Sequence, residues 1–398
     1  MTALSQRPLK VAILADAVFD SLGGAAKGRP DGFAASWLPS SAGALLERED
    51  LEISWISLVR GLKGRGEEKS GRHHFIELPA FPVSIDTWLN YRVARRRLLS
   101  ELRALQVDLV HCWGSESPYP SVIGHTDRPT VISLNGILAG LKRRGLLPDG
   151  IWWQRQAGHE TRWLSQVDAV IAESRWTEAE VRKTVPAART FAASYGVHSS
   201  FYQLAREADR GSPYLLFAGT LSHAKGVDLL LDALTLLPDR KWICRIAGDG
   251  PMRDQLKSRG IPGVEWLGSL AWPAYQEVLR HASALVLPTR ADSHPNVVKE
   301  ARVVGIPVIT TRQGGQADYL RDGENACLLD EPDAAALAAA LDRWMNDPAA
   351  LQAAGLIGNA EDRERFDSRE TARNFADIYR EVARGGAADL SGDGRFDS

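Results

Sequence analysis

The sequence predicts an α/β protein built from two doubly wound domains. Short apolar runs alternate with amphipathic helical patterns along most of the 398 residues. Most of these runs are continuously apolar rather than alternating, which is typical of parallel strands covered by helices on both faces. The series is too long for one ordinary core, so we expect two copies of the same architecture.

The expected strands fall into two series along the chain. The first series is "KVAILAD", "LEISWISL", "DLVHCW", "TVISLNG" and "DAVIAES", and the second is "YLLFAG", "WICRIAG", "VEWLG", "SALVLP" and "PVIT". Helical patterns lie between them, as in residues 227–237 and in "TEAEVRK", where Thr177 and Glu180 have the spacing of a capping box. A strand that recurs after each helix favours parallel sheets.

A polar stretch at residues 198–212 separates the two series. We therefore expect a first domain over residues 1–205 and a second over 206–365. A last helix follows within 366–385. The ending 386–398 has too few apolar residues to pack, so we expect it to be disordered.

The composition excludes several classes of protein. Apolar residues make up 44% of the chain and charged residues 25%, with a formal net charge of -2, which argues against a nucleic-acid binder. We find no pattern of a signal peptide and no window long and apolar enough for a membrane span. Cys112, Cys244 and Cys327 lie in strand-like runs without a C-x-x-C pair, which favours core thiols in a reducing cytoplasm.

The most informative stretch is "RADSHPNVVKEARVVGIPVI", residues 290–309. A helix from Asn296 would bury Val297, Ala301 and Val304 on one stripe, yet Glu300 lies on that stripe as well. A buried carboxylate without a partner is costly, so it needs a ligand or an ion pair. Arg302 and Arg312 are the nearby cations that could pair with it.

The start of the same helix is suited to an anion. If Pro295 is the first helical residue, the N–H groups of Asn296, Val297 and Val298 have no intrahelical partner and can bind a phosphate. Glu300 would lie about 7.5 Å further along the axis, where its carboxylate could accept two hydroxyls of a ribose.

Other strand–loop junctions offer weaker signals. Gly23 and Gly24 follow the first strand and could let backbone N–H groups approach a phosphate, although a plain surface loop explains them equally well. Gly219 ends a strand of the second series, and Lys225 with Gly226 then opens a helix, which would make an anion site of a lysine and free N–H groups.

Taken in order, "GTLSHAKGVDLLLDAL", "RIAGDGP", "WLGSL" and the run from "ALVLPTRADSHPNVVKEARVVG" to "ENACLL" resemble the retaining family-4 glycosyltransferases of the GT-B fold. The resemblance covers the C-terminal half and extends more loosely to "DLVHCWG", "ISLNGI" and "DAVIAES". It implies two Rossmann-like domains facing each other across a cleft, with the last helix crossing back to the first domain. It also implies a nucleotide-sugar donor in the second domain and a sugar or lipid-linked acceptor in the first.

The resemblance also assigns roles to residues. The family's paired acids fall on Asp292, which would contact the donor sugar, and on Glu300, which would hold the ribose. The backbone of Pro295, Asn296, Val297 and Val298 would cup the diphosphate, and Lys225 would stabilise the leaving phosphate. This electrostatic role requires no metal ion and no further cofactor.

Three positions depart from the family pattern. Thr220, after Gly219, stands where the family usually has an arginine, so one cation is missing from the donor site. Asp292 replaces a glutamate and is shorter by roughly 1.5 Å. Asn135 replaces a histidine; it can still hydrogen-bond a sugar hydroxyl, but it does not titrate near neutral pH.

The acceptor side offers aromatic and basic residues. Trp152 and Trp153 could stack on sugar rings, although tryptophans are more often core residues. Residues 56–105 hold ten basic and five acidic residues, and "WLNYRVARRRLLSELRAL" reads as a basic amphipathic helix. Such a helix within 86–105 could lie on an anionic membrane, which would place the protein in the cytoplasm and peripherally on the inner membrane face; an ordinary solvated helix face is the alternative.

Two other functions remain open. A nucleotide-sugar epimerase of the same fold would lack the paired acids in this form, whereas a non-catalytic nucleotide-sugar-binding protein would agree with the departures at Thr220 and Asp292. The nucleotide base, the sugar and the acceptor are not identified by the sequence.

Overall fold

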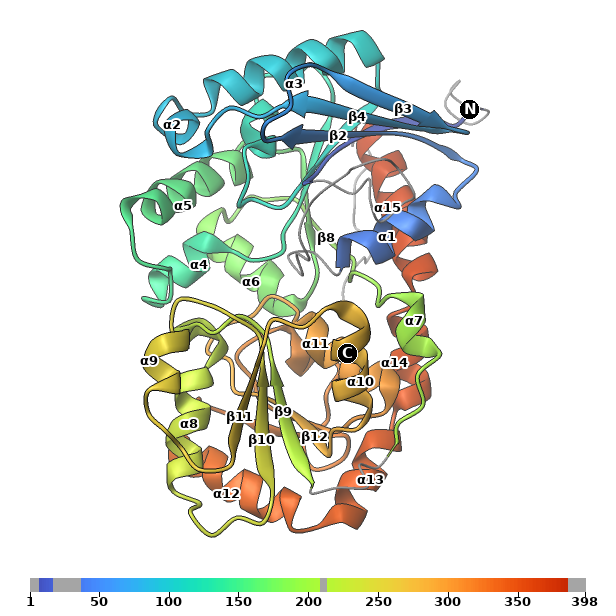
Figure 1. Ribbon diagram of the computed structural model, residues 1–398. Helices are drawn as coiled ribbons and strands as arrows, with labels where there is room; N and C mark the ends of the chain where they lie inside the picture. Colours follow the sequence, from blue (N-terminus) through green and yellow to red (C-terminus); the bar gives the residue numbers. More distant parts are fainter. Residues whose placement is uncertain (1–6, 17–36, 208–212, 386–398) are drawn as a thin grey trace. The chain divides into compact units, whose positions relative to one another are not determined.

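The computed structural model describes residues 7–16, 37–207 and 213–385 of the chain. These residues form two compact units (Figure 1). The first unit contains residues 38–195, the first strand and the last helix, and the second contains residues 196–367. Gly23, Gly24 and the predicted tail 386–398 lie outside the described residues.

The sheet of the first unit has the strand order β3-β4-β2-β1-β5-β6-β7-β8. Its strands are β1 (Leu9–Leu14), β2 (Leu51–Val59), β3 (Gly66–Ser70), β4 (His73–Pro79), β5 (Leu109–Trp113), β6 (Thr130–Ser133), β7 (Ala169–Ala172) and β8 (Thr190–Ala192). All neighbours are parallel except β3, which pairs with β4 in the antiparallel sense. The five strands predicted here are confirmed. We did not predict β3, because "GEEKS" is a polar edge strand, nor β4 and β8, which lack a long apolar run.

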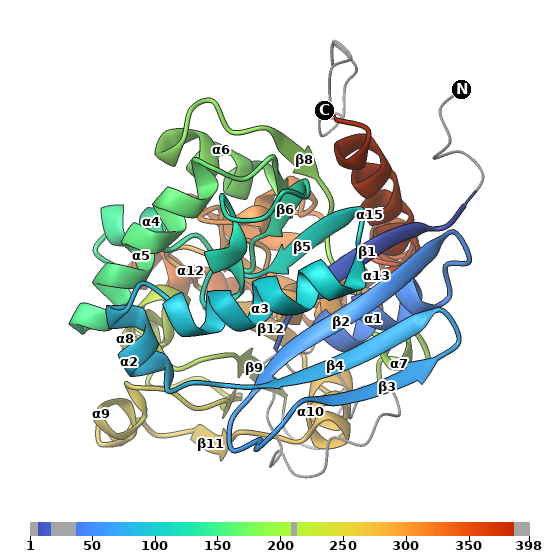
Figure 2. The same ribbon diagram turned by 90° about the horizontal axis from the view of Figure 1, so that it is seen from above.

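The helical segments of this unit are α1 (Trp37–Leu46), α2 (Val83–Trp88), α3 (Arg92–Leu105), η4 (Tyr119–Val122), α4 (Leu138–Arg143), α5 (Ile151–Leu164), α6 (Arg175–Thr184) and α15 (Ser368–Ala383). Helix α3 buries Ala94, Leu98 and Leu102 and contacts β2 (Figure 2). The last helix, α15, contacts β5 and β6, where the Tyr379 hydroxyl lies 2.8 Å from Nδ1 of His111.

Two predicted helix features are wrong. Residues 88–105 do not form one helix, because Asn90 and Tyr91 adopt positive φ angles of 51° and 57° and separate α2 from α3. The buried carboxylate of Asp86 accepts hydrogen bonds from the N–H groups of Val93 and Ala94, so it stabilises a fresh helix start at this point.

The predicted capping box at Thr177 and Glu180 is the second error. Helix α6 begins earlier, and the hydroxyl of Ser174 caps it by accepting from the N–H of Thr177 at 3.1 Å. Glu180 instead forms ion pairs with Arg143, Arg144 and Lys183. The buried carboxylate of Glu180 is paired with these three cations and so connects α6 to the end of α4.

The sheet of the second unit is fully parallel, with the order β11-β10-β9-β12-β13-β14. Its strands are β9 (Tyr214–Ala218), β10 (Ile243–Ala247), β11 (Val264–Gly268), β12 (Ala284–Leu287), β13 (Val308–Thr311) and β14 (Ala326–Leu329). The five predicted strands are confirmed, and β14 is an additional short strand. The strand order reverses between β9 and β12, and open α/β sheets bind ligands at such a switch point.

The helical segments of the second unit are α7 (Ser199–Tyr202), η5 (His223–Lys225), α8 (Val227–Thr235), α9 (Arg253–Lys257), α10 (Trp272–Arg280), α11 (Asn296–Val304), η6 (Gly315–Asp318), α12 (Ala334–Met345), α13 (Pro348–Leu356) and α14 (Asn359–Arg365). The unit begins at Gly196, before the expected boundary at 205. Val197 pairs with Asp367, and Phe201 is fully buried in the core of this unit, so the chain joins the second unit earlier than the polar composition of 198–212 indicates.

Two further findings concern the chain as a whole. Cys112, Cys244 and Cys327 are free and buried, and burial raises the pKa of each thiol. Within the described residues, no helix combines the length and the apolar character that crossing a membrane requires.

Candidate active site

A cavity of about 380 Å³ lies in the second unit, where β9, β10, β11 and β12 end. Its lining comprises Ala218, Gly219, Thr220, Lys225, Ala247, Gly248, Asp249, Ser269, Leu270, Trp272, Tyr275, Leu287, Pro295, Asn296, Val297 and Glu300. The cavity therefore collects most of the residues predicted for the donor site of the second domain. Among the described residues, no three His, Cys, Asp or Glu side chains lie close enough together to hold a metal ion.

The loops after β9 and β10 are tightly packed through glycines. Gly226, at φ 73°, ends η5 and opens α8, and a Cβ atom there would lie 1.9 Å from the carbonyl oxygen of Pro288. Gly248 has φ 137°, and its Cβ atom would lie 1.9 Å from the carbonyl oxygen of Gly219. Only glycine allows this approach, which holds Lys225 at the wall of the cavity.

Helix α11 presents its N-terminus to the cavity. Pro295 is the N-cap residue rather than the first helical residue, and the helix begins at Asn296. The N–H of Val298 donates to the carbonyl of Pro295 at 3.1 Å, so our prediction of a free N–H at Val298 is wrong. This bond closes the first turn and leaves Asn296 and Val297 to face the cavity.

The side chain of Asn296 adds a polar group to the same wall. Its Oδ1 atom is buried and has no hydrogen-bond partner among the described residues. The indole Nε1 of Trp272, on the facing helix α10, is likewise buried without a partner in the described part of the chain. Buried polar atoms are normally paired, so a polar ligand in the cavity would satisfy both.

Glu300 is the carboxylate at the bottom of this wall. It is only 5% exposed, and its Oε2 atom accepts a hydrogen bond of 2.9 Å from the hydroxyl of the buried Tyr275. Burial raises the pKa of Glu300 to about 7, which the bond from Tyr275 partly opposes. The alternative ion pairs are not formed, because Arg302 pairs with Asp362 and Arg312 with Asp330.

The second predicted acid, Asp292, lies against Lys225. Its carboxylate forms an ion pair with Nζ of Lys225, and its backbone is held to the loop after β13 by bonds with Gln313 and Gly315. Lys225 lines the cavity but Asp292 does not. The acid predicted to contact the donor sugar and the lysine predicted to stabilise the leaving phosphate are therefore in direct contact.

Thr220 leaves the cavity with little positive charge. Lys225 is the sole Lys or Arg among the described residues that line it. Arg290 lies two residues before Asp292 in the sequence. Both of its terminal nitrogens donate to the carboxylate of Asp228, and one also donates to the carbonyl of His223. This arrangement fixes the η5 turn rather than supplying a second cation.

Sequence reasoning missed Tyr275 and Trp272. Both lie on an amphipathic helix, where an aromatic residue is normally a core residue, and Tyr275 is buried in the core of the second unit. The hydroxyl that reaches Glu300 leaves no signal in the sequence, since 25 residues separate the pair.

The predicted residues of the first unit form a separate cluster. Asn135 follows β6, and its Oδ1 atom is buried without a hydrogen-bond partner among the described residues. A Cβ atom at Gly114 would lie 2.8 Å from Nδ2 of Asn135 and 2.9 Å from Oε2 of Glu116, so both side chains flank the end of β5. Burial, with the carboxylates of Glu160 and Asp16 as weaker causes, raises the pKa of Glu116 to about 7.

Trp152 and Trp153 lie elsewhere in the first unit. They are half-buried at the start of α5 and pack edge to face, with ring centroids 4.5 Å apart. The indole N–H of Trp152 donates to the hydroxyl of Thr87 at 3.0 Å, which ties α5 to α2. The structure therefore gives Trp152 a packing role.

The fold is that of a doubly wound α/β protein, and the cavity lies at the switch point of the sheet of its second unit. The family model for glycosyl transferases group 1 matches residues 203–368, and the model for glycosyltransferase family 4 matches residues 44–201. The chain belongs to this family of glycosyltransferases and has their GT-B fold.

Among curated proteins, a glycogen synthase of Mycobacterium tuberculosis is 26% identical over 307 residues, which is 73% of each chain. A D-inositol 3-phosphate glycosyltransferase of Streptomyces bingchenggensis is 33% identical over 186 residues, covering 43% of this chain and 41% of its own.

Two solved structures extend the likeness to the whole fold. Sucrose-phosphate synthase of Thermosynechococcus elongatus has a TM-score of 0.78 at 16% identity, covering 95% of this chain and all of its own. Anabaena HepE in complex with UDP-glucose has a TM-score of 0.68 at 16% identity, covering 94% of this chain and 100% of its own.

Proposed function

We propose that this glycosyltransferase moves a sugar from a nucleoside-diphosphate sugar to an acceptor hydroxyl with retention of configuration and without a metal ion. One observation carries the proposal. A single cavity collects a lysine, the open end of a helix and a buried carboxylate, which are the groups that a diphosphate and a ribose require.

The order of these groups along α11 suits the order of groups in a nucleotide. The N–H groups of Asn296 and Val297 would bind the diphosphate at the positive end of the helix. Glu300 follows four residues later, about 6 Å along the axis at the usual rise. There its carboxylate would accept ribose hydroxyls, which offsets the cost of burying it.

The chemical step breaks the bond between the anomeric carbon and the β-phosphate oxygen. The oxygen takes the electron pair, the acceptor oxygen bonds to the anomeric carbon on the same face, and the acceptor proton passes to the departing phosphate. Lys225 would stabilise the negative charge that grows on the phosphate, as preorganised cations do in other active sites. Asp292 would keep Lys225 in place until the donor binds and would then contact the donor sugar.

The acceptor side is proposed for the first unit. Asn135 offers an unsatisfied polar atom, with the Glu116 carboxylate beside it, at the strand ends where α/β sheets bind ligands. The relatives that make glycogen and inositol glycosides lead us to propose a carbohydrate or a lipid-linked sugar as the acceptor, in polysaccharide or glycolipid synthesis. We propose a cytoplasmic protein with peripheral membrane contact.

The experiment is nucleotide release from UDP-, GDP- and ADP-sugars, with and without EDTA, by the full chain and by Lys225→Ala. We expect release from one donor class, no effect of EDTA, and a loss of about 10²–10³-fold in Lys225→Ala. Lys241→Ala, an exposed lysine of the same unit, is the matched control. Equal turnover in Lys225→Ala would refute the assigned role, and inversion at the anomeric carbon by NMR would refute retention.

One observation favours binding without turnover as the second candidate. Among the described residues that line the cavity, Lys225 is the single cation, and it is already paired with Asp292. A thermal-shift screen across nucleoside diphosphates separates the two functions. Stabilisation by a nucleotide without release from any sugar donor, with any acceptor, would establish the binding protein.

A further inference from the structure

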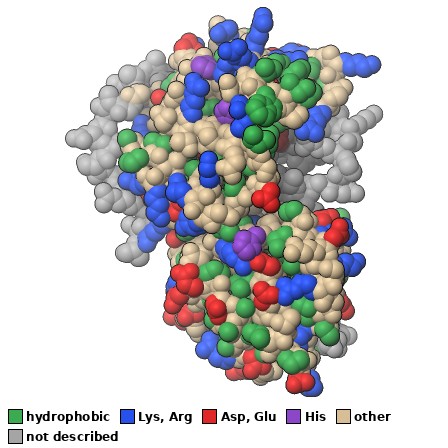
Figure 3. All heavy atoms as spheres, turned by 90° about the vertical axis from the view of Figure 1, so that its left-hand side faces the viewer, with side chains coloured by type: hydrophobic (Ala, Val, Ile, Leu, Met, Phe, Trp, Pro, Cys, Tyr) green, Lys and Arg blue, Asp and Glu red, His purple; other side chains and the backbone are tan. Residues whose placement is uncertain are grey.

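Large apolar side chains are exposed together on one surface of the first unit. Ile85, Trp88 and Leu89, in and just after α2, are 52%, 57% and 43% exposed, and Ile151 at the start of α5 is 64% exposed. These are four of the seven large hydrophobic residues that are exposed in the described part of the chain. We call them the α2–α5 apolar patch. Figure 3 shows hydrophobic side chains gathered on this unit, beside Lys and Arg side chains.

The patch is held in place by contacts beneath it. The hydrogen bond from Trp152 to Thr87 joins the two helices, and the guanidinium of Arg155 lies 4.4 Å from the centre of the Trp88 ring. Asp86 is turned inward and engaged with the start of α3. No carboxylate of α2 therefore remains on the outer surface, while the apolar side chains stay outside.

Helix α3 continues this surface with uncompensated positive charge. It carries five arginines and one glutamate, and that glutamate, Glu101, is buried against Arg65. Arg92 and Arg96 are exposed one turn apart, and neither side chain has an ion pair among the described residues. Burial lowers the pKa of Arg95, and the positive charges of Arg92 and Arg162 lower it further.

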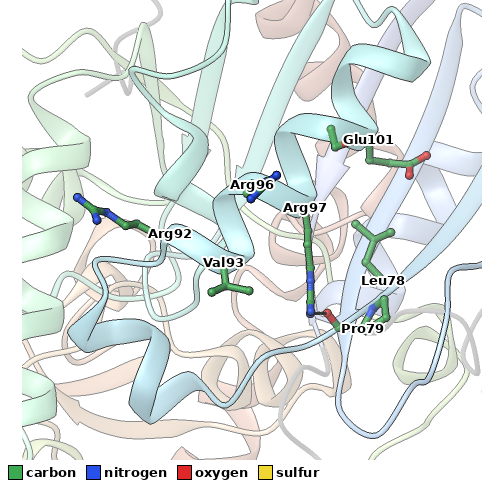
Figure 4. A pocket seen from close by; sticks show the side chains of 8 residues that line it. Leu78, Pro79, Arg92, Val93, Arg96, Arg97 and Glu101 are labelled. Atoms are coloured by element: carbon green, nitrogen blue, oxygen red, sulfur yellow. Dashed lines mark hydrogen bonds between the residues drawn. The ribbon is translucent and has the colours of Figure 1, made fainter.

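A groove of about 600 Å³ runs beside these arginines (Figure 4). Leu78, Pro79 and Val93 supply apolar lining, and Arg92, Arg96 and Arg97 supply positive charge. Glu101 also lines the groove, but its carboxylate is paired with Arg65. Arg97 donates to the carbonyl of Pro79 and so borders the groove from within. An apolar lining with guanidinium groups at its edge matches a phosphate head group attached to an acyl chain.

We propose that the α2–α5 apolar patch and the α3 arginines form a docking surface for an anionic lipid bilayer. Exposed isoleucine, leucine and tryptophan enter the boundary between head groups and acyl chains, and the neighbouring arginines bind lipid phosphates. The charge complementarity is local, because the whole chain carries a formal charge of -2. A nucleic acid would match the arginines but not the adjacent apolar side chains.

The test is co-sedimentation of the full chain with vesicles, without donor or acceptor, so its outcome is independent of sugar transfer. We expect binding to vesicles of phosphatidylglycerol and phosphatidylcholine at low salt, weaker binding at 0.5 M NaCl, and little binding to phosphatidylcholine alone. Absence of binding to the anionic vesicles at low salt would overturn the proposal.

Two double variants locate the surface. Arg92→Gln/Arg96→Gln should weaken binding about thirty-fold, since each cation near an anionic surface contributes a factor of about five. Ile85→Glu/Trp88→Glu should reduce binding at least as much, because it places charge among the head groups. Circular dichroism and the unfolding midpoint verify that each variant is folded.

Matched controls lie on the second unit. Lys241→Gln/Lys257→Gln removes the same charge from exposed positions, and Leu236→Glu changes a leucine that is 55% exposed. We expect both controls to bind vesicles like the unchanged protein. If the controls lose binding as much as the surface variants do, or if the folded surface variants bind normally, the docking surface is not the one proposed.

Discussion

Replacing Glu300 by glutamine should stabilise the ligand-free protein and weaken nucleotide binding. The variant keeps the size of the side chain and an oxygen that can accept from Tyr275, but it removes the buried negative charge. In the unfolded chain this carboxyl titrates near its ordinary pKa of 4.5, whereas burial raises the pKa to about 7 in the folded protein.

The sign of the effect follows from proton binding. Between pH 4.5 and 7 the folded protein holds a proton on Glu300 that the unfolded chain has lost. The free energy of unfolding therefore falls as pH rises through this window. At about 1.4 kcal/mol per pKa unit, the total is about 3 kcal/mol. Glu300→Gln should be more stable than the unchanged protein by about this amount at pH 8, and about equally stable at pH 4.5.

The assay is urea unfolding at both pH values, with nucleotide binding by calorimetry at pH 8. We expect the affinity for the preferred nucleoside diphosphate to fall at least tenfold, since a hydrogen bond to a charged group contributes about 1.5–3 kcal/mol. Glu331→Gln, an exposed carboxylate of the same unit, is the control. If the stability difference does not grow with pH, the buried charge is not costly; unchanged affinity would refute the ribose assignment.

Three further predictions follow from the same unit. Tyr275→Phe removes the hydroxyl that orients the buried carboxylate, so nucleotide affinity measured by calorimetry should fall about tenfold; an unchanged Kd would contradict a positioning role. Asp362→Ala leaves the guanidinium of Arg302 buried without its carboxylate and should lower the free energy of unfolding in urea by about 3 kcal/mol; a loss below 1 kcal/mol would mean that backbone carbonyls suffice. Gly226→Ala should lower the unfolding midpoint more than Gly260→Ala, because both have positive φ but only Gly226 has backbone within contact of an added Cβ; equal shifts would contradict this close approach.

Much of the fold could be predicted from the sequence because a buried parallel strand has a clear composition. Ten predicted runs, most of them continuously apolar, correspond to ten strands of two doubly wound sheets. The polar edge strand β3 and the short strand β8 lack this composition, since edge positions and brief pairings do not require apolar residues on both faces. Strand β14 is apolar but only four residues long. The break between α2 and α3 also escaped prediction, because it depends on the buried Asp86 rather than on glycine or proline.

The candidate site likewise has features that the sequence predicts and contacts that it does not. The local spacing of "PNVVKE" gave the helix start and the carboxylate, since both are set by the helix itself. The partner of that carboxylate lies 25 residues away on α10, and the partner of Lys225 lies 67 residues away in the loop after β12. Contacts of this kind depend on how the helices pack on the sheet, so local spacing does not fix them.

By itself, the sequence determined the α/β architecture and the set of groups suited to a diphosphate and a ribose, because periodicity, glycine positions and charge type are local properties. Only the tertiary structure decided that Glu300 accepts a hydrogen bond from Tyr275 and that Lys225 forms an ion pair with Asp292. It also decided that an apolar patch adjoins arginines without ion pairs on the described part of the first unit. Burial and pairing are properties of the packed chain, and they set both the pKa of a carboxylate and the exposure of an apolar surface.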